Sequence, residues 1–319
     1  MALLVAAISA AAVAIVAVAV LSVDGDSAGA PSTTTEPELR QGRPPLSFAL
    51  GFRVDREARD LTDGAALYQQ GKLEEAAGRF ARHDSLEAKV GAAFVAWPDG
   101  TLDRLEQLAK LYPEAAVVQL HLGLARLWAN EGDPTEAWRA ALDAEPDTPY
   151  AIVAGNLLHP SLPRGLPAFI PSFTASAALT KLPPARQLEA LRVAAERGGV
   201  REQLLYGVGL QRVGRPVSAA RVFEAATQAF PEEVEAQVAG AVGVFDKDAP
   251  EKAFGRLGPL SKTYPNEPSV RFHLGLLLLW TGRIDGAQRQ FQLAAEARPG
   301  SPLAREADRY LETIRRARS

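Results

Sequence analysis

Small and large apolar residues recur in the second half of the chain at a fixed spacing of 34 residues. Four columns share this spacing, and each has three members: Gly207, Ala241 and Gly275; Ala219, Ala253 and Ala287; Phe223, Leu257 and Phe291; Pro231, Pro265 and Pro299. A period of this length is typical of stacked supersecondary units, and the spacing inside each unit fits two helices. The pattern therefore predicts consecutive helical hairpins.

Each column has a physical role in such a hairpin. The two small residues let the paired helices approach closely, and the large residue one turn further on packs against the neighbouring unit. The prolines end the second helices. Gly214 and Gly282 mark the turn between the helices, where Asp248 stands in the middle unit because aspartate tolerates turn geometry. We expect three clear hairpins, over residues 200–233, 234–267 and 268–301.

These columns resemble the tetratricopeptide family, in which small residues, a large apolar or aromatic residue and a proline occupy the same places in a 34-residue unit. The resemblance implies an all-α fold, a tetratricopeptide-type α-solenoid of antiparallel helix pairs in a superhelix. It also implies a protein that binds other proteins.

Weaker copies extend the pattern toward the N-terminus. One copy runs through Gly64, Leu67, Gly71, Ala76 and Phe80. Another, with extra residues at its turn, runs through Gly123, Gly132, Ala137 and Ala144. Residues 85–113 lie between them and read as a shortened pair with its turn at 97–100. Residues 302–317 resemble the cap helix that ends such arrays. We expect one solenoid over residues 47–319.

The fourth unit carries a proline-rich insertion at residues 157–173. Four prolines within these residues exclude a single helix. The insertion is also apolar, unlike a solvated linker, so it needs a surface to lie on. Its residues Phe169, Ile170 and Phe173 are candidates for filling the protein's own groove, either permanently or as a displaceable plug.

The family resemblance implies a groove lined by the first helix of each unit. At the corresponding positions the chain has Leu204, Val208, Gln211, Val238, Val242, Phe245, Phe272, Leu276 and Leu279. This largely apolar set suits an amphipathic or extended hydrophobic segment of a partner protein. Some family members capture a C-terminal carboxylate with Lys, Arg and Asn at such positions; these residue types are missing here. The alternative is that the groove meets no partner, because it faces a closed superhelix or the insertion.

The first residues predict a membrane anchor. Residues 2–23 contain no charged side chain, and as a helix they would be about 30 Å long, enough to span the hydrocarbon layer. A cleaved signal peptide is the alternative, because Ala28-Gly29-Ala30 has the form of a cleavage site. Against it, no basic residue precedes the apolar run, the run is long, and Pro31 follows the site. Asp24 and Asp26 favour an extracytoplasmic solenoid on a single-pass protein of the cell membrane.

Residues 24–46 predict a flexible linker, because four prolines stand there among Gly, Ser, Thr and Asp. Such a composition buries too little apolar area to fold on its own. The chain would then have three parts: residues 1–23 in the membrane, residues 24–46 as a tether, and residues 47–319 as the solenoid.

Charge and chemistry narrow the function classes. A formal charge of −3, with basic and acidic residues interleaved, provides no footprint for nucleic acid. Cysteine is absent, which excludes disulfides and thiolate chemistry. The four histidines are scattered, and no phosphate loop, nucleophile elbow or zinc signature occurs. We expect no catalytic, cofactor-binding or metal-binding residues.

The sequence therefore predicts a membrane-anchored scaffold or assembly factor that binds apolar partner segments and is not an enzyme. Two alternatives remain. In the first, the solenoid is a self-assembling or accessory component of a cell-envelope complex. Complexes of cytochrome c maturation or secretion are settings suggested by resemblance alone. In the second, the solenoid is an accessory domain of a larger sensor or enzyme. Abundant Arg, Ala, Gly and Pro with few Lys suggest a bacterial protein.

Overall fold

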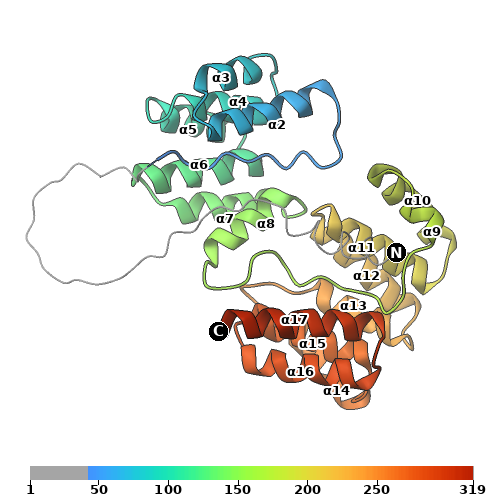
Figure 1. Cartoon of the computed structure of the whole chain (residues 1–319). Helices are drawn as coiled ribbons and strands as arrows, with labels where there is room; N and C mark the ends of the chain where they lie inside the picture. The colour runs from blue at the N-terminus through green and yellow to red at the C-terminus, as the bar shows by residue number, and fades with distance from the viewer. Residues whose placement is uncertain (1–41, 319) are drawn as a thin grey trace, which may run out of the picture. The chain divides into compact units, whose positions relative to one another are not determined.

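The computed structural model describes residues 42–318, which form sixteen helices, labelled α2 to α17, and no strand (Figure 1). The helices start where the sequence supplies caps. The side chains of Asp55, Ser85 and Thr148 each accept a hydrogen bond from a backbone N–H in the first turn of the following helix. The turn glycines Gly214 and Gly282 both have φ of +72°, the left-handed conformation that glycine adopts without strain.

The chain divides into two compact units with the boundary after Pro160. The boundary lies inside the predicted insertion at residues 157–173. The described part of the expected solenoid over residues 47–319 is divided between these two units. Each is described separately below.

The first unit has three helical hairpins and a closing helix. These are α2 (Arg56–Gln69) with α3 (Leu73–Phe80), α4 (Leu86–Val95) with α5 (Thr101–Leu111), α6 (Ala116–Ala129) with α7 (Pro134–Ala144), and then α8 (Pro149–Leu158). Their shared core includes Phe80, Phe94, Leu105 and Tyr150. Helix α6 is buried on nearly all sides, because it packs against α4, α5, α7 and α8.

The second unit repeats this plan after two additional helices. It begins with α9 (Ala177–Thr180) and α10 (Pro184–Arg197). Three hairpins and a closing helix follow: α11 (Val200–Arg212) with α12 (Pro216–Ala229), α13 (Val234–Gly243) with α14 (Glu251–Thr263), α15 (Pro268–Trp280) with α16 (Ile284–Ala297), and then α17 (Pro302–Arg318). In both units, consecutive helices pack against each other along the array.

The small residue in the first helix of a hairpin makes room for an aromatic ring of the second. A Cβ added at Gly207 would stand 2.2 Å from the Phe223 ring, and one added at Gly275 would stand 2.8 Å from the Phe291 ring. The first unit has the same pairing between Gly64 and Phe80 at 2.6 Å. These distances are too short for any side chain, so the column of small residues follows from close helix packing.

The prediction of an all-α array of antiparallel helix pairs with tetratricopeptide-like columns is confirmed for residues 42–318. The three clear hairpins correspond to α11–α16, and the expected cap helix corresponds to α17. The shortened pair expected at residues 85–113 corresponds to α4 and α5.

Among the helices of residues 42–318, none combines the length and the apolar character that spanning a membrane requires. The predicted anchor at residues 2–23 lies outside the described residues, as does most of the predicted linker. The last residues of that linker are described, and Pro44 and Leu46 are buried against the first unit.

Candidate binding grooves

Residues 161–175, called here the second-unit segment, run in a largely extended conformation along the second unit (Figure 1). The segment contacts α11, α13 and α15, the first helices of the three hairpins. We call this contacted surface the second-unit groove. The contacts are of two kinds, hydrogen bonds to the segment backbone and one deeply buried side chain.

Three groove side chains accept hydrogen bonds from backbone N–H groups of the segment. Phe169 donates to Gln211 Oε1 over 3.2 Å, Ile170 donates to His273 Nε2 over 3.0 Å, and Ser172 donates to Glu235 Oε1 over 2.9 Å. Gln211, His273 and Glu235 belong to α11, α15 and α13, respectively. Each hairpin of the unit thus contributes one acceptor.

Groove side chains also donate to the carbonyl groups of the segment. Lys247 Nζ donates to the Pro163 oxygen over 3.0 Å, and Trp280 Nε1 donates to the Gly165 oxygen over 3.2 Å. Arg201 donates to the Thr174 oxygen over 2.8 Å. The segment therefore runs from the C-terminal ends of the first helices toward their N-terminal ends, antiparallel to them. Burial lowers the pKa of Lys247 to about 8.

Phe169 is the side chain that enters most deeply. It is 1% exposed and lies edge-on to Phe223, with ring centroids 5.4 Å apart, and parallel to the His273 ring at 5.0 Å. Ile170 and Phe173 are half-buried. The Arg201 guanidinium lies over the Phe173 ring at 4.6 Å, a favourable cation–π geometry. All three residues of the predicted plug thus lie against the second unit.

His273 is held in one protonation state by its neighbours. Its Nδ1–H donates to the Ser269 carbonyl over 2.6 Å, so Nε2 is free to accept from the Ile170 N–H. The ring is fully buried, and burial lowers the pKa of His273 to about 4. The histidine is therefore neutral at pH 7. Its acceptor nitrogen is part of the groove.

The predicted groove residues separate into two sets. Leu204, Val208, Val238, Val242 and Phe245 belong to the same buried cluster as Phe169, and Gln211 hydrogen-bonds to the segment. The other three pack in a different cluster with α16 and α17: Phe272, Leu276 and Leu279. Phe272 lies 5.6 Å from Phe291 and 5.9 Å from Tyr310, because the closing helix covers this side of α15.

Of the polar residues of the groove, sequence reasoning identified only Gln211. The predicted groove residues did not include Glu235, Lys247, Trp280 and Arg201. They did not include His273 either, although the repeat alignment places that histidine near the groove. The partners in these hydrogen bonds are far apart in the sequence; the Ile170 to His273 bond, for example, joins residues 103 positions apart.

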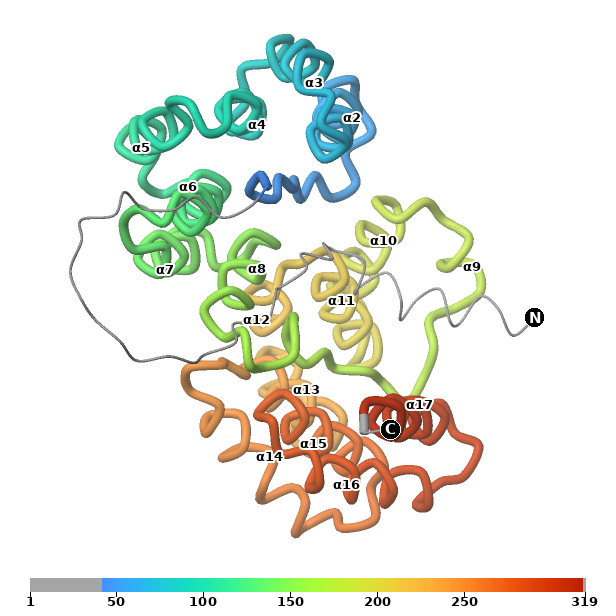
Figure 2. The backbone as a smooth tube through the Cα atoms, turned by 60° about the vertical axis from the view of Figure 1, so that its left-hand side comes forward, coloured from blue at the N-terminus to red at the C-terminus, as the bar shows by residue number. Residues whose placement is uncertain are grey.

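The first unit holds an extended segment of its own, residues 43–50, called here the first-unit segment. Figure 2 shows it inside the arc of α2 to α8, and we call the surface that it contacts the groove of the first unit. Tyr68 donates to the Pro44 oxygen over 2.9 Å, and Gln69 donates to the Leu46 oxygen over 3.3 Å. The Ala49 N–H donates to the Tyr150 hydroxyl over 3.1 Å. Leu46 is fully buried.

The two units place matching residues around their segments. The centroid of the Phe48 ring lies 6.0 Å from that of Phe80 and 5.9 Å from that of His121. The Phe169 ring lies near Phe223 and His273 in the same way. Both histidines open the sequence His-Leu-Gly-Leu, at residues 121–124 and 273–276. His121 also donates from Nδ1 to the carbonyl four residues earlier, Val117, over 2.7 Å. The recurring His-Leu-Gly-Leu was the available sequence signal that the units correspond.

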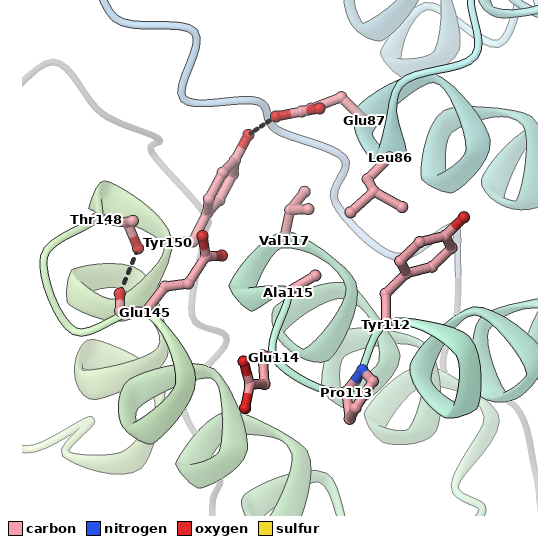
Figure 3. A pocket seen from close by; sticks show the side chains of 10 residues that line it. All are labelled: Leu86, Glu87, Tyr112, Pro113, Glu114, Ala115, Val117, Glu145, Thr148 and Tyr150. Carbon is pink, nitrogen blue, oxygen red and sulfur yellow. Dashed lines mark hydrogen bonds between the residues drawn. The ribbon is translucent and has the colours of Figure 1, made fainter.

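A cavity of about 460 Å³ opens in the first unit at the N-terminal ends of α4, α6 and α8 (Figure 3). Its lining is made of ten residues: Leu86, Glu87, Tyr112, Pro113, Glu114, Ala115, Val117, Glu145, Thr148 and Tyr150. Figure 3 shows the Tyr150 hydroxyl directed toward Glu87, with a hydrogen bond of 3.3 Å. Glu145 accepts from the Ala116 N–H over 2.7 Å and so caps the start of α6.

Neither groove contains a metal-binding arrangement. Within residues 42–318, no three His, Asp or Glu side chains are placed to hold a metal ion. The chemistry of both grooves is that of hydrogen bonding and apolar packing. Both features suit the recognition of an extended polypeptide.

No protein-family model matches the chain, and no curated protein matches it. Solved structures do show similarity. YrrB, described as a TPR protein with an unusual peptide-binding site, is 13% identical over 65% of this chain and 99% of its own, with a TM-score of 0.31. Yeast Tom70 is 13% identical over 87% of this chain and 68% of its own, with a TM-score of 0.32.

The TPR domain of P58(IPK) is 15% identical over 83% of this chain and 79% of its own, with a TM-score of 0.29.

Proposed function

We propose that the protein is an interaction scaffold whose second-unit groove binds an extended apolar segment of a partner protein in place of its own residues 163–173. One observation carries the proposal. Three side chains on three successive hairpins accept hydrogen bonds from the backbone N–H groups of Phe169, Ile170 and Ser172. A surface built in this way recognises an extended chain through its backbone.

Backbone recognition makes exchange chemically reasonable. Binding in the groove requires one large side chain in the place of Phe169 and backbone N–H groups at fixed positions. Segments of other sequences can meet these requirements. The covalently attached segment acts at an effective concentration on the order of millimolar. A partner segment must therefore bind more tightly than residues 163–173 do, or act when that segment is weakened.

A synthetic peptide tests the exchange. The probe is a fluorescently labelled peptide with the sequence of residues 163–175, titrated into the parent protein and into the Phe169→Ala variant. We expect the variant to bind the peptide at least tenfold more tightly than the parent does, because its own segment competes less. Fluorescence anisotropy gives the affinities, and circular dichroism confirms that the variant remains helical.

The control is the same peptide with alanine in place of its first phenylalanine, which should bind the variant at least tenfold more weakly. Equal binding of the two peptides, or of the two proteins, would refute the exchange. Light scattering covers the self-assembly alternative. A mass that rises with concentration to a dimer would show that the segment exchanges between copies, and this would replace a foreign partner with a second copy of the chain.

We propose further that residues 2–23 attach the scaffold to the cell membrane, with the two units on the extracytoplasmic side. The support is the uncharged apolar run in the sequence. The full chain should sediment with membranes and resist carbonate extraction, whereas a chain starting at residue 42 should stay in the supernatant. A soluble protein whose N-terminus is Pro31 would instead establish a cleaved signal peptide.

A further inference from the structure

The cavity of the first unit corresponds to the part of the second unit that holds the end of the second-unit segment. Glu87 and Glu235 are the second residues of α4 and α13, and each is followed by Ala, a polar residue and Val. Glu235 accepts the Ser172 N–H, so the second-unit segment passes over this carboxylate and continues to Phe173. Glu87 instead lines the cavity.

The first-unit segment stops short of Glu87. It turns away after Leu50, whose carbonyl accepts a hydrogen bond from the Arg53 N–H. The Tyr150 hydroxyl fills the gap, since it accepts from the Ala49 N–H over 3.1 Å and donates to Glu87 over 3.3 Å. Glu87 thus accepts its hydrogen bond from the Tyr150 hydroxyl, whereas Glu235 accepts one from a segment backbone N–H. The groove of the first unit extends beyond its occupant.

The charge at this end of the groove differs between the units. In the second unit burial raises the pKa of Glu235; the nearby Glu267 raises it as well, whereas Arg298, the C-cap of α16, lowers it. In the first unit the C-cap of α7 is Glu145, which lines the cavity beside Glu87 and Glu114. None of the ten lining residues is basic.

The cavity also offers apolar and aromatic surface. Leu86, Val117 and Tyr112 form one part of its lining, and Tyr112 is 40% exposed. The ring of Tyr112 already attracts a cation, because Lys89 Nζ lies 5.9 Å from its centroid. The site thus combines three carboxylates, an aromatic face and an apolar wall within one cavity.

From these observations we infer that the cavity is a second binding site, for an extended partner segment in which an apolar side chain is followed by Arg or Lys. The apolar side chain lies against Leu86 and Val117, as Phe173 lies against the second unit. The cationic group meets the cavity's carboxylates, one of which, Glu145, occupies the C-cap position that Arg298 has in the second unit. This site is separate from the second-unit groove, so it stands or fails independently of the proposed exchange.

The test uses three capped peptides and the full chain. The probe has the sequence Ile-Pro-Ser-Phe-Arg-Ala, which repeats residues 170–173 and adds arginine; its controls carry Glu for Arg or Ala for Phe. We expect the probe to bind at least tenfold more tightly than either control at low salt. The difference between the Arg and Glu peptides should shrink as salt rises, because the attraction is partly screened.

Variants locate the site. The double change Glu87→Gln with Glu114→Gln should weaken probe binding at least tenfold, because both amides keep the size of the side chain and remove its charge. Glu131→Gln, an exposed acid outside the cavity lining, removes one charge from the same unit and should change binding less than twofold. Thermal unfolding establishes that the variants are folded.

The Phe169→Ala variant separates this site from the second-unit groove. Probe affinity should be unchanged in that variant, since its substitution lies in the other unit. A probe that gains affinity from Phe169→Ala, and loses none from the double change, binds the second-unit groove and overturns the inference. Equal affinity for the Arg and Glu peptides overturns it as well.

Discussion

Replacing Phe169 with alanine should lower the free energy of unfolding of the second unit by about 3–5 kcal/mol, the usual range for removing a buried phenylalanine. The ring is 1% exposed and contacts Phe223 and His273, so its loss leaves a cavity between α12 and α15. Hydrogen exchange of peptides from α11, α13 and α15 measures this unit separately from the first.

Phe52→Ala is the matched control. The Phe52 side chain is 41% exposed, so its removal should cost less than about 1 kcal/mol. A loss below about 1 kcal/mol in the Phe169→Ala variant would mean that the segment leaves the groove readily. Such a result would make the segment a weak occupant rather than part of the core.

Acidification should destabilise each unit by about 3 kcal/mol between pH 7 and pH 4 through its buried histidine. Burial lowers the pKa of His121 and of His273 to about 4, against an ordinary value of 6.5. Between these values the unfolded chain binds more protons than the folded chain. The stabilisation is therefore complete above pH 6.5 and is lost progressively as the pH falls toward 4.

The hydrogen bond between Ile170 and His273 also explains why acid destabilises the second unit. Protonation of His273 would place an N–H on Nε2, facing the Ile170 N–H that this nitrogen now accepts. The charged histidine therefore opposes binding of the segment as well as burial. Acid should release the second-unit segment before the helices unfold.

Denaturant titrations at pH 7 and pH 5.5 measure the effect, which should reach about 1 kcal/mol per histidine at the lower value. Glu235 has a pKa raised by burial and works in the opposite direction near its ordinary range, so the comparison stays above pH 5. In His273→Leu the pH dependence of the second unit should largely disappear. An unchanged pH dependence in that variant would contradict the assignment.

The helical architecture could be predicted from the sequence because the contacts that determine each hairpin lie within that hairpin. Gly207 with Phe223 and Gly275 with Phe291 are contacts within single hairpins, and such pairs repeat with the period of the fold. The division into two units could not be derived in the same way. The division is marked by the recurrence of whole hairpins rather than of single positions. This recurrence is hard to recognise because the α4–α5 hairpin is shortened.

The segments show why the sites were only partly predictable. The insertion could be recognised as an apolar chain needing a surface, and Phe169 was named among its candidates. The start of the first-unit segment, residues 43–46, was expected to belong to the flexible linker over residues 24–46, because four prolines stand there among Gly, Ser, Thr and Asp. The segment's buried Leu46 and half-buried Phe48 can be recognised as anchors only in the folded unit, where Leu46 belongs to the hydrophobic core cluster, Phe48 packs against that cluster, and the Phe48 ring contacts Phe80 and His121.

The prolines of the second-unit segment have one more consequence, which concerns register. The groove accepts N–H groups from residues 169, 170 and 172, and the prolines at 167 and 171 have none. Sliding the chain by one or two residues in either direction would bring Pro167 or Pro171 opposite Gln211, His273 or Glu235. Each slip would thereby lose a hydrogen bond, so proline spacing selects a single alignment of the segment. A partner segment bound as proposed would meet the same requirement. Proline is compatible with the position between the second and third N–H donors, but with none of the three donor positions.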